Sequence, residues 1–116
     1  MKQLLFSYGT LQLEKVQLES FGRILKGKSS RLYNYKLGQV EINDISVLEK
    51  SQTNSHPIAI KTNQLSDFID GIIFEITDEE LIKADEYEVD DYMRIKENFE
   101  SELSAWVYVQ NTNKIS

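Results

Sequence analysis

Short apolar segments, separated by glycines and polar turns, follow one another along the chain. The first segment, Leu4 to Phe6, ends abruptly at the turn Tyr8-Gly9-Thr10-Leu11, which is typical of a buried strand that opens into a loop. Residues 13–21 contain good helix formers and stop at Gly22, so a short helix is predicted there. The chain is therefore expected to begin with a strand, a tight turn and a helix.

Segments rich in β-forming residues follow this helix, and their spacing predicts several strands with tight connections. The polar stretch 49–55 lacks periodicity and is interpreted as a loop. In the last apolar segment Trp106 and Tyr108 share one face, where they line either the core or a pocket. The expected strands cover residues 23–28, 30–39, 40–48, 56–61, 68–76, 92–96 and 105–109.

Gly71 lies inside the most apolar of these segments. A glycine within a strand marks a bulge, a close approach of another backbone or a ligand, or a plain bend, and the sequence leaves these readings open. The residues that follow, Thr77-Asp78-Glu79-Glu80, form a capping box. A helix is therefore predicted from this point to about Glu88.

Glu88 occupies an unusual position on the predicted helix. It follows Leu81 by seven residues and Ala84 by four, so a continuous helix would direct it inward, with Asp85 close to the same stripe. A carboxylate directed at a core is costly unless it is paired or functional, and raised pKa values and acid–base chemistry occur at such sites. Alternatively, the helix ends earlier and Glu88 is an ordinary exposed acid.

The turn after the first strand is a candidate binding site. The amides of Thr10, Leu11 and Gln12 would lie near a helix start, where N–H donors can hold a carboxylate or a phosphate. No lysine follows Gly9 as in a P-loop and no G-x-G-x-x-G is present, which disfavours a nucleotide. An ordinary strand-to-helix turn is the alternative interpretation.

Length and charge limit the function further. A chain of 116 residues is expected to form one domain, 1–116, and its formal charge of −6 argues against nucleic acid as a partner. Residues 75–102 carry a net charge of −9, which is interpreted mainly as a solvated face. The short N-terminal apolar run fits neither a signal peptide nor a membrane span, so a cytoplasmic protein is expected.

No cofactor or metal is expected from the residues available. The chain has no cysteine, which removes disulfides, thiolate metal sites and cysteine nucleophiles. Its single histidine, His56, has no partner at metal-ligand spacing and is interpreted as structural or exposed.

Two motifs give the chain a resemblance to the γ-glutamylcyclotransferase-like family, which includes γ-glutamylamine cyclotransferases and many small bacterial and plant members. The family's Tyr-Gly-Thr-Leu is matched by residues 8–11, and its Leu-Asp-x-Tyr/Phe-Glu and Tyr-x-Arg are matched by residues 84–88 and 92–94. Gly71, Trp106 and Tyr108 are weaker echoes. Two residues depart from the family pattern, Ala84 in place of the leucine and Val89 in place of a frequent glycine. The second could alter the position of Glu88, because a valine cannot adopt the backbone angles open to a glycine.

The resemblance implies an α+β fold, a small, mostly antiparallel β-barrel with short flanking helices. It also implies cyclisation of a γ-glutamyl amine or γ-glutamyl amino acid to 5-oxoproline without a cofactor. Glu88 would act as general acid and base. The implied substrate-binding residues are Tyr8, Gly9, Thr10, Leu11, Gly71 and Tyr92.

Two alternatives from other functional classes remain open at this point. One is a catalytically inactive binding module on the same fold, a reading suggested by Val89. The other is a protein-interaction domain whose acidic residues 75–102 bind a basic partner.

Overall fold

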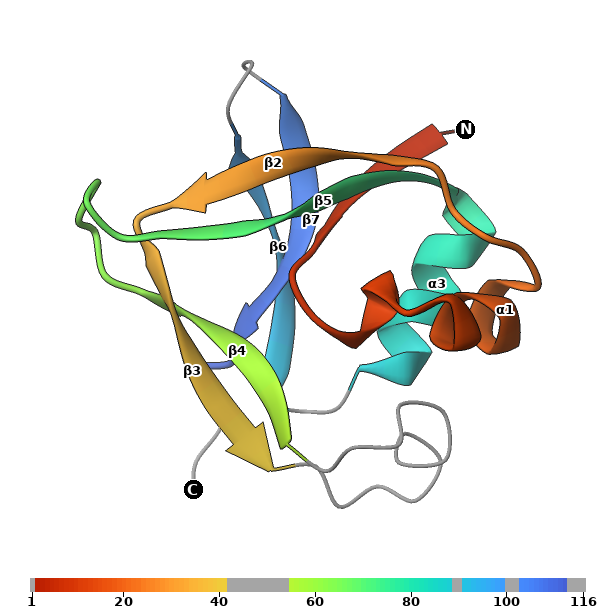
Figure 1. Cartoon of the computed structure of the whole chain (residues 1–116), viewed down its shortest axis with the longest axis horizontal. Coiled ribbons are helices and arrows are strands. Elements are labelled where there is room, and N and C mark those ends of the chain that lie inside the picture. The colour runs from red at the N-terminus through yellow and green to blue at the C-terminus, as the bar shows by residue number, and fades with distance from the viewer. Residues whose placement is uncertain (1, 42–54, 89–90, 100–102, 113–116) are drawn as a thin grey trace.

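The computed structural model describes residues 2–41, 55–88, 91–99 and 103–112. These residues form an α+β fold with a five-stranded sheet, in the order β2-β5-β1-β7-β6, and a two-stranded sheet of β3 and β4 (Figure 1). The elements are β1 (Lys2–Ser7), the 3-10 turn η1 (Thr10–Gln12), α1 (Glu14–Phe21), β2 (Gly27–Tyr33), β3 (Tyr35–Glu41), β4 (Ser55–Lys61), β5 (Phe68–Thr77), α3 (Asp78–Tyr87), β6 (Tyr92–Asn98) and β7 (Ser104–Gln110).

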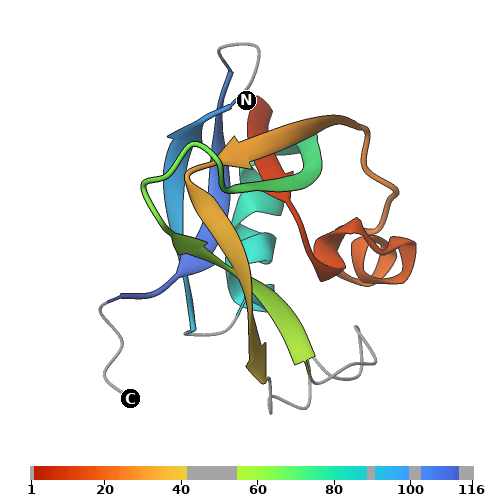
Figure 2. The ribbon, with the colours of Figure 1, turned by 60° about the vertical axis from the view of Figure 1, so that its left-hand side comes forward.

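The five-stranded sheet has the helices on one face and the β3–β4 hairpin on the other (Figures 1 and 2). Neighbouring residues of a strand point to opposite faces, so Leu5 packs with the helices and Phe6 packs toward the hairpin. In β7, Tyr108 joins the helix-side core, whereas Val107 and Val109 join the other. The predicted division of this strand between two faces is therefore confirmed.

β1 lies in the middle of the larger sheet and carries the turn that follows it. It pairs antiparallel with β5 along its length and parallel with β7 at Leu5 and Phe6, which makes the sheet mixed. Both of these side chains are 1% exposed. The end of β1 is consequently held by strand pairing along both edges and by side-chain packing on both faces.

The described strands do not close into the barrel that the resemblance implies. Residues 30–39, expected as one strand, are divided at Asn34, whose φ of 73° lies in the left-handed region. The Asn34 N–H donates to the Asp67 carbonyl (2.9 Å), and the Asn34 carbonyl accepts from the Thr62 N–H (2.7 Å). Beyond this corner the chain leaves β5 and pairs with β4, so among the described residues the two sheets share no ladder.

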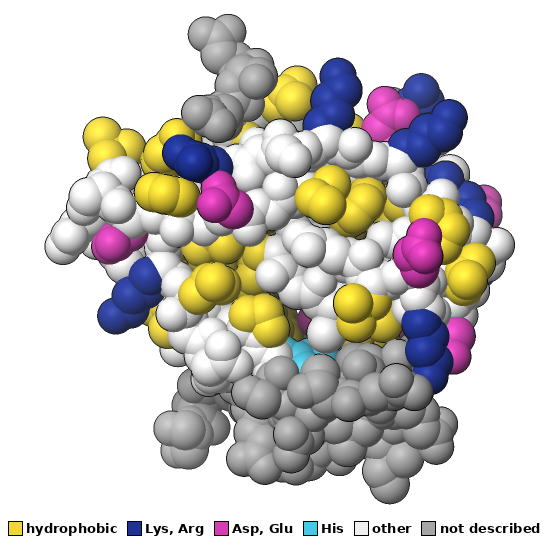
Figure 3. Space-filling model, in the orientation of Figure 1, with side chains coloured by type: hydrophobic (Ala, Val, Ile, Leu, Met, Phe, Trp, Pro, Cys, Tyr) yellow, Lys and Arg dark blue, Asp and Glu magenta, His cyan; other side chains and the backbone are white. Residues whose placement is uncertain are grey.

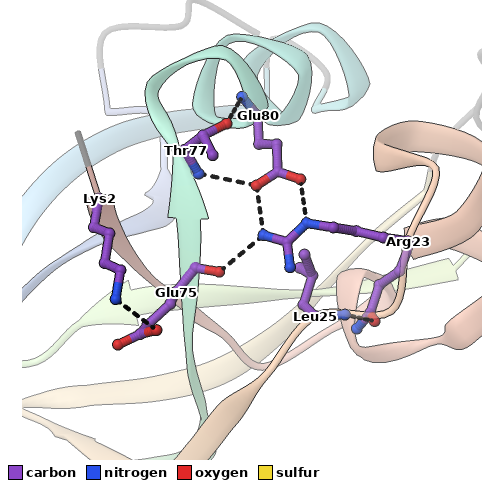
Figure 4. Close-up of polar contacts among 7 residues, drawn as sticks. Lys2, Arg23, Leu25, Glu75, Thr77 and Glu80 are labelled. Carbon is purple, nitrogen blue, oxygen red and sulfur yellow. Dashed lines mark hydrogen bonds and ion pairs between the residues drawn. The ribbon is translucent and has the colours of Figure 1, made fainter.

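The segment between α1 and β2 corrects the strand expected at 23–28, because strand pairing starts only at Gly27. Arg23 instead donates two hydrogen bonds of 2.7 Å to the Glu80 carboxylate (Figure 4). The Leu25 N–H donates to the Gln17 side chain (2.9 Å). These side-chain contacts take the place of a strand ladder and tie this segment to α1 and α3.

The capping box predicted at the start of α3 is confirmed. The Glu80 N–H donates to the Thr77 hydroxyl (3.1 Å), and the Thr77 N–H donates to the Glu80 carboxylate (2.9 Å), as Figure 4 shows. The same carboxylate therefore caps α3 and binds Arg23. Two N–H groups at the start of α3 thereby gain hydrogen-bond partners, and the Glu80 carboxylate gains a cationic partner.

The helix predicted at 13–21 is confirmed as α1, and Gly22 ends it with a φ of 72°. The predicted strand residues 42–48 and the loop residues 49–54 lie outside the described part of the chain, while Ser55 already belongs to β4. Neither helix in the described ranges has the length and apolar character needed to cross a bilayer.

Candidate functional site

A cavity opens where the turn after β1 meets the end of α3 and strands β4, β6 and β7. Its enclosed volume is about 30 Å³, and about 340 Å³ of empty space is present when the open mouth is included. A larger hollow of about 460 Å³ lies by β2 and contains none of the predicted site residues. The described residues that line the cavity are Phe6, Ser7, Tyr8, Gly9, Thr10, Leu11, His56, Pro57, Glu88, Tyr92 and Tyr108.

The predicted turn lies at one wall of this cavity. Residues Thr10–Gln12 form the 3-10 turn η1, which separates the turn from α1 because Leu13 is extended (φ −76°, ψ 131°) and caps that helix. Within the described residues, the N–H groups of Thr10 and Leu11 have no hydrogen-bond partner. Two free donors are therefore present beside the cavity, although they do not belong to the N-terminus of α1.

Space, rather than backbone angle, explains the glycine at position 9. Its φ is −137°, which other residues can adopt. A Cβ at this position would lie 3.3 Å from Cγ of Pro57 across the cavity wall. The turn and the start of β4 therefore approach each other closely, and a larger side chain would have to displace Pro57.

Glu88 lines the cavity, but it is not part of the helical stripe that the spacing predicts. The helix α3 ends at Tyr87, and Glu88 is its C-cap with extended angles (φ −77°, ψ 139°) and an N–H donated to the Ala84 carbonyl (3.1 Å). Among the described residues no group donates a hydrogen bond to its carboxyl group. Burial, with a smaller effect from the charge of Asp85, raises the pKa of Glu88 to about 8.

The phenols of Tyr8 and Tyr92 are bound to the backbone. The Tyr8 hydroxyl donates to the Tyr108 carbonyl (2.5 Å) and accepts from the Ala59 N–H (2.9 Å). The Tyr92 hydroxyl donates to the Pro57 carbonyl (2.6 Å). Each phenol has a single proton to donate, so these two rings form walls of the cavity and hold its strands together.

Gly71, predicted as a substrate-binding residue, lies within β5 and does not line the cavity, although it packs against Phe6 and Ser7, which do. A Cβ there would come within 2.5 Å of both the Phe6 ring and the Ser7 carbonyl oxygen. Of the readings left open by the sequence, close approach of another part of the chain is the one observed, because β5 pairs with Ser30 and its neighbours without a bulge.

Sequence reasoning did not assign two polar residues of the cavity wall. His56 is 3% exposed and lines the cavity, although its lack of metal-ligand partners suggested only a structural or exposed position. Tyr108 also lines it, which the strand pattern left open as core or pocket wall. A signal existed for Tyr108, because the alternation predicted for residues 105–109 left its face as core or pocket wall, whereas residues 56–61 were predicted only as a strand.

The described residues contain no group of three or more histidine, aspartate or glutamate side chains arranged to hold a metal ion. Burial brings the pKa of Glu88 close to neutrality and raises the pKa of the phenols of Tyr8, Tyr92 and Tyr108 further above it. The cavity is thus suited to proton transfer on a small polar ligand.

Comparisons with known proteins connect this fold and cavity to a family. The family model for gamma-glutamyl cyclotransferase, AIG2-like, matches residues 5–116. Comparison with curated protein sequences gave no match. A solution structure of an Arabidopsis thaliana protein is similar with a TM-score of 0.73 and 18% identity, covering 99% of this chain and 72% of that chain.

Two further solved structures are similar over nearly the whole chain. A structure described as a gamma-glutamyl cyclotransferase gives a TM-score of 0.71 at 15% identity, covering 96% of this chain and 68% of that chain. An uncharacterized protein from Pyrococcus horikoshii gives 0.64 at 16% identity, covering 98% of this chain and 82% of that chain. At these identities the structures show the shared fold.

The α+β fold and a cavity between a Tyr-Gly-Thr-Leu turn and a helix-terminal glutamate define the class of protein. The chain belongs to the gamma-glutamyl cyclotransferase, AIG2-like family, since the family model covers nearly all of it. The resemblance carried by the two motifs is thereby confirmed. Membership supports a cyclotransferase-type activity on a small-molecule substrate in general.

Proposed function

We propose that this protein cyclises a γ-glutamyl amine or γ-glutamyl amino acid to 5-oxoproline, with Glu88 as the proton-transfer group. The observation that carries the proposal is the Glu88 carboxyl group, which lines the cavity without a hydrogen-bond donor among the described residues and has a pKa raised to about 8. A catalytic acid–base group works best when its pKa lies near the working pH.

The reaction needs no external reactant. The α-amino nitrogen of the substrate attacks its own γ-carbonyl carbon, so that a new C–N bond closes the lactam ring while the C–N bond to the leaving amine breaks. The α-amino group attacks as the neutral amine, and as the new C–N bond forms its nitrogen gives one proton to Glu88 in its carboxylate form. Glu88 then gives this proton to the departing amine, which leaves the carboxylate ready for another turnover.

The free N–H groups of Thr10 and Leu11 support a second role for the turn. Both residues line the same cavity as Glu88, and we propose that their N–H groups donate to the α-carboxylate of the substrate or to the oxyanion that develops on the γ-carbonyl. Such preorganised donors lower the barrier because they need no reorganisation as charge develops. The proposed division of work is therefore anion binding by the turn and proton transfer by Glu88.

The cavity is small, about 30 Å³, and about 340 Å³ of empty space is present when its open mouth is included. In the proposed reaction the γ-glutamyl group lies against the turn and Glu88, and the leaving amine extends toward the mouth.

The direct test is release of 5-oxoproline from a panel of γ-glutamyl amino acids, γ-glutamyl amines and glutathione. We expect at least one to be cyclised, and Glu88→Gln to lower its turnover by roughly 10²- to 10⁴-fold because a glutamine cannot transfer the proton. Glu86→Gln is the matched control, since Glu86 is exposed on the same helix. Equal turnover by parent and Glu88→Gln would exclude the proposed mechanism.

An inactive binding module on the same fold is the second candidate, and Val89 in place of the family's frequent glycine is the feature that favours it. A γ-glutamyl compound that raises the melting temperature but yields no 5-oxoproline would establish it. An acidic docking domain has less support. On the face seen in Figure 3, acidic side chains lie interspersed with lysine and arginine rather than in one acidic surface.

A further inference from the structure

Asp85 lies one helical turn before Glu88 and does not line the cavity. Its two carboxylate oxygens have different partners. The Tyr108 hydroxyl donates to Oδ1 over 2.7 Å, and Nη1 of Arg94 lies 3.4 Å from Oδ2. Asp85 therefore connects α3 to strands β6 and β7 directly behind the cavity wall.

The cation that balances Asp85 is held in place by its own surroundings. The Arg94 guanidinium lies over the Trp106 ring, 4.5 Å from its centre, and the side chain is 27% exposed. Its Nη1 atom is buried and, within the described part of the chain, makes no hydrogen bond. The ion pair with Asp85 is consequently the contact that compensates this buried nitrogen, so neither charge can be removed without affecting the other.

Tyr108 carries the effect of this pair to the cavity. Tyr108 lines the cavity, its hydroxyl is fixed by Asp85, and its backbone carbonyl accepts the Tyr8 hydroxyl (2.5 Å). The residue is thus held at its side-chain hydroxyl and at its backbone. Loss of the Asp85 contact would free the wall that lies beside Glu88.

We propose that Asp85 is a positioning residue, which holds the Tyr108 wall of the cavity and, balanced by Arg94, keeps a negative charge one turn from Glu88. The inference rests on the proposed function, in which Glu88 carries the proton. Both effects have the same origin, because the carboxylate that accepts the Tyr108 hydroxyl is also the nearest charged group of α3.

The groups around Glu88 determine how this charge acts. Tyr8 faces it from the end of β1, His56 from β4, Tyr92 from β6 and Tyr108 from β7, with Asp85 on its own helix. The three phenols stay neutral over the working range, and Asp85 is the charged group that acts on Glu88. Its repulsion adds to burial in favouring the protonated form of Glu88.

Two variants separate the charge from the positioning. Asp85→Asn keeps the size and still accepts the Tyr108 hydroxyl, but it removes the charge. Tyr108→Phe keeps the charge and removes the hydrogen bond. The readouts are the titration midpoint of the Glu88 carboxyl carbon by NMR and, for a substrate that the parent cyclises, kcat against pH.

We expect Asp85→Asn to move the Glu88 midpoint to lower pH, with the acidic limb of the activity profile moving in the same direction. Arg94→Met, which removes the balancing cation, should move the midpoint to higher pH. Tyr108→Phe should leave the midpoint close to that of the parent and lower kcat by up to about 10²-fold, as expected when a reacting geometry loosens. Glu86→Gln, the exposed acid of the same helix, should change neither quantity.

An unchanged or raised midpoint in Asp85→Asn would overturn the inference. If this variant does not fold, the upward shift in Arg94→Met is the deciding measurement, and its absence has the same consequence. The NMR titration needs no substrate. A parent that forms no 5-oxoproline but shows the predicted shifts would therefore refute the proposed function alone, whereas turnover without the shifts would refute the role of Asp85 alone.

Discussion

Replacing Glu88 with glutamine should stabilise the protein, by an amount that grows with pH. Glutamine has nearly the shape of glutamate but carries no charge at any pH. In the folded parent, burial raises the pKa of Glu88 to about 8, against 4.5 for a solvated glutamate. Between these values the folded state binds a proton that the unfolded state lacks, so the parent loses stability as pH rises.

The magnitude follows from the two pKa values. Each unit of difference corresponds to about 1.4 kcal/mol, so the loss in the parent is near zero at pH 4, about 3 kcal/mol at pH 7 and about 5 kcal/mol above pH 8. The variant has no such loss. The difference in free energy of unfolding between Glu88→Gln and the parent should therefore follow this curve.

Urea unfolding at several pH values between 4 and 9 measures this difference, with fluorescence of the single tryptophan, Trp106, as the probe. Glu86→Gln is the control, and its stability should follow that of the parent because its side chain is exposed. A difference between Glu88→Gln and the parent that stays constant from pH 5 to 9 would refute the burial of a neutral Glu88.

Three further substitutions test the contacts around the cavity and α3. Tyr8→Phe leaves two backbone groups unpaired and should lower the free energy of unfolding by about 2–4 kcal/mol. Turnover of the folded variant should change little. A large loss of turnover with unchanged stability would contradict the role of Tyr8 as a wall of the cavity. Gly9→Val should abolish binding of 5-oxoproline, measured by calorimetry, because the new side chain meets Pro57. Circular dichroism should show that the variant is folded. Unchanged binding would exclude the turn from the site. Arg23→Met should lower the free energy of unfolding by about 1 kcal/mol at pH 7 and by less at pH 3. Arg23 lowers the pKa of Glu80, so the stabilisation from the ion pair is lost as Glu80 becomes protonated. An equal loss at both pH values would contradict the ion pair.

Local signals in the sequence predicted most of the elements. The capping box at Thr77 and Glu80, and the glycine stop at Gly22, depend on residues within one or two turns, so the printed sequence contains all the information they need. The alternation predicted for residues 105–109 likewise separates Tyr108 from Val107 and Val109, which pack in different cores. The resemblance added the family, which no periodicity could supply.

Features that depend on distant partners were predicted wrongly or not at all. The corner at Asn34 is fixed by Asp67 and Thr62, which lie about thirty residues away. The barrel is not confirmed, because this corner directs β3 to β4 and the two sheets share no ladder within the described residues. The inward position of Glu88 was expected from helical spacing, yet the helix ends one residue earlier and the extended C-cap directs it to the cavity instead. In that case the placement was right and the reason was wrong.

The two motifs of the family are joined in space by side chains that the motif letters alone do not connect. The hydroxyl groups of Thr10 and Tyr87 lie 2.7 Å apart and share a hydrogen bond, so the turn is fixed to the residue immediately before Glu88. Asp85 of the same motif holds Tyr108 at the opposite wall. This contact couples the turn to the end of α3, and so connects the amides proposed to bind an anion with Glu88, the proposed proton-transfer group. Since intramolecular aminolysis depends on the relative placement of these two groups rather than on either alone, this connection between the motifs is what the proposed chemistry requires.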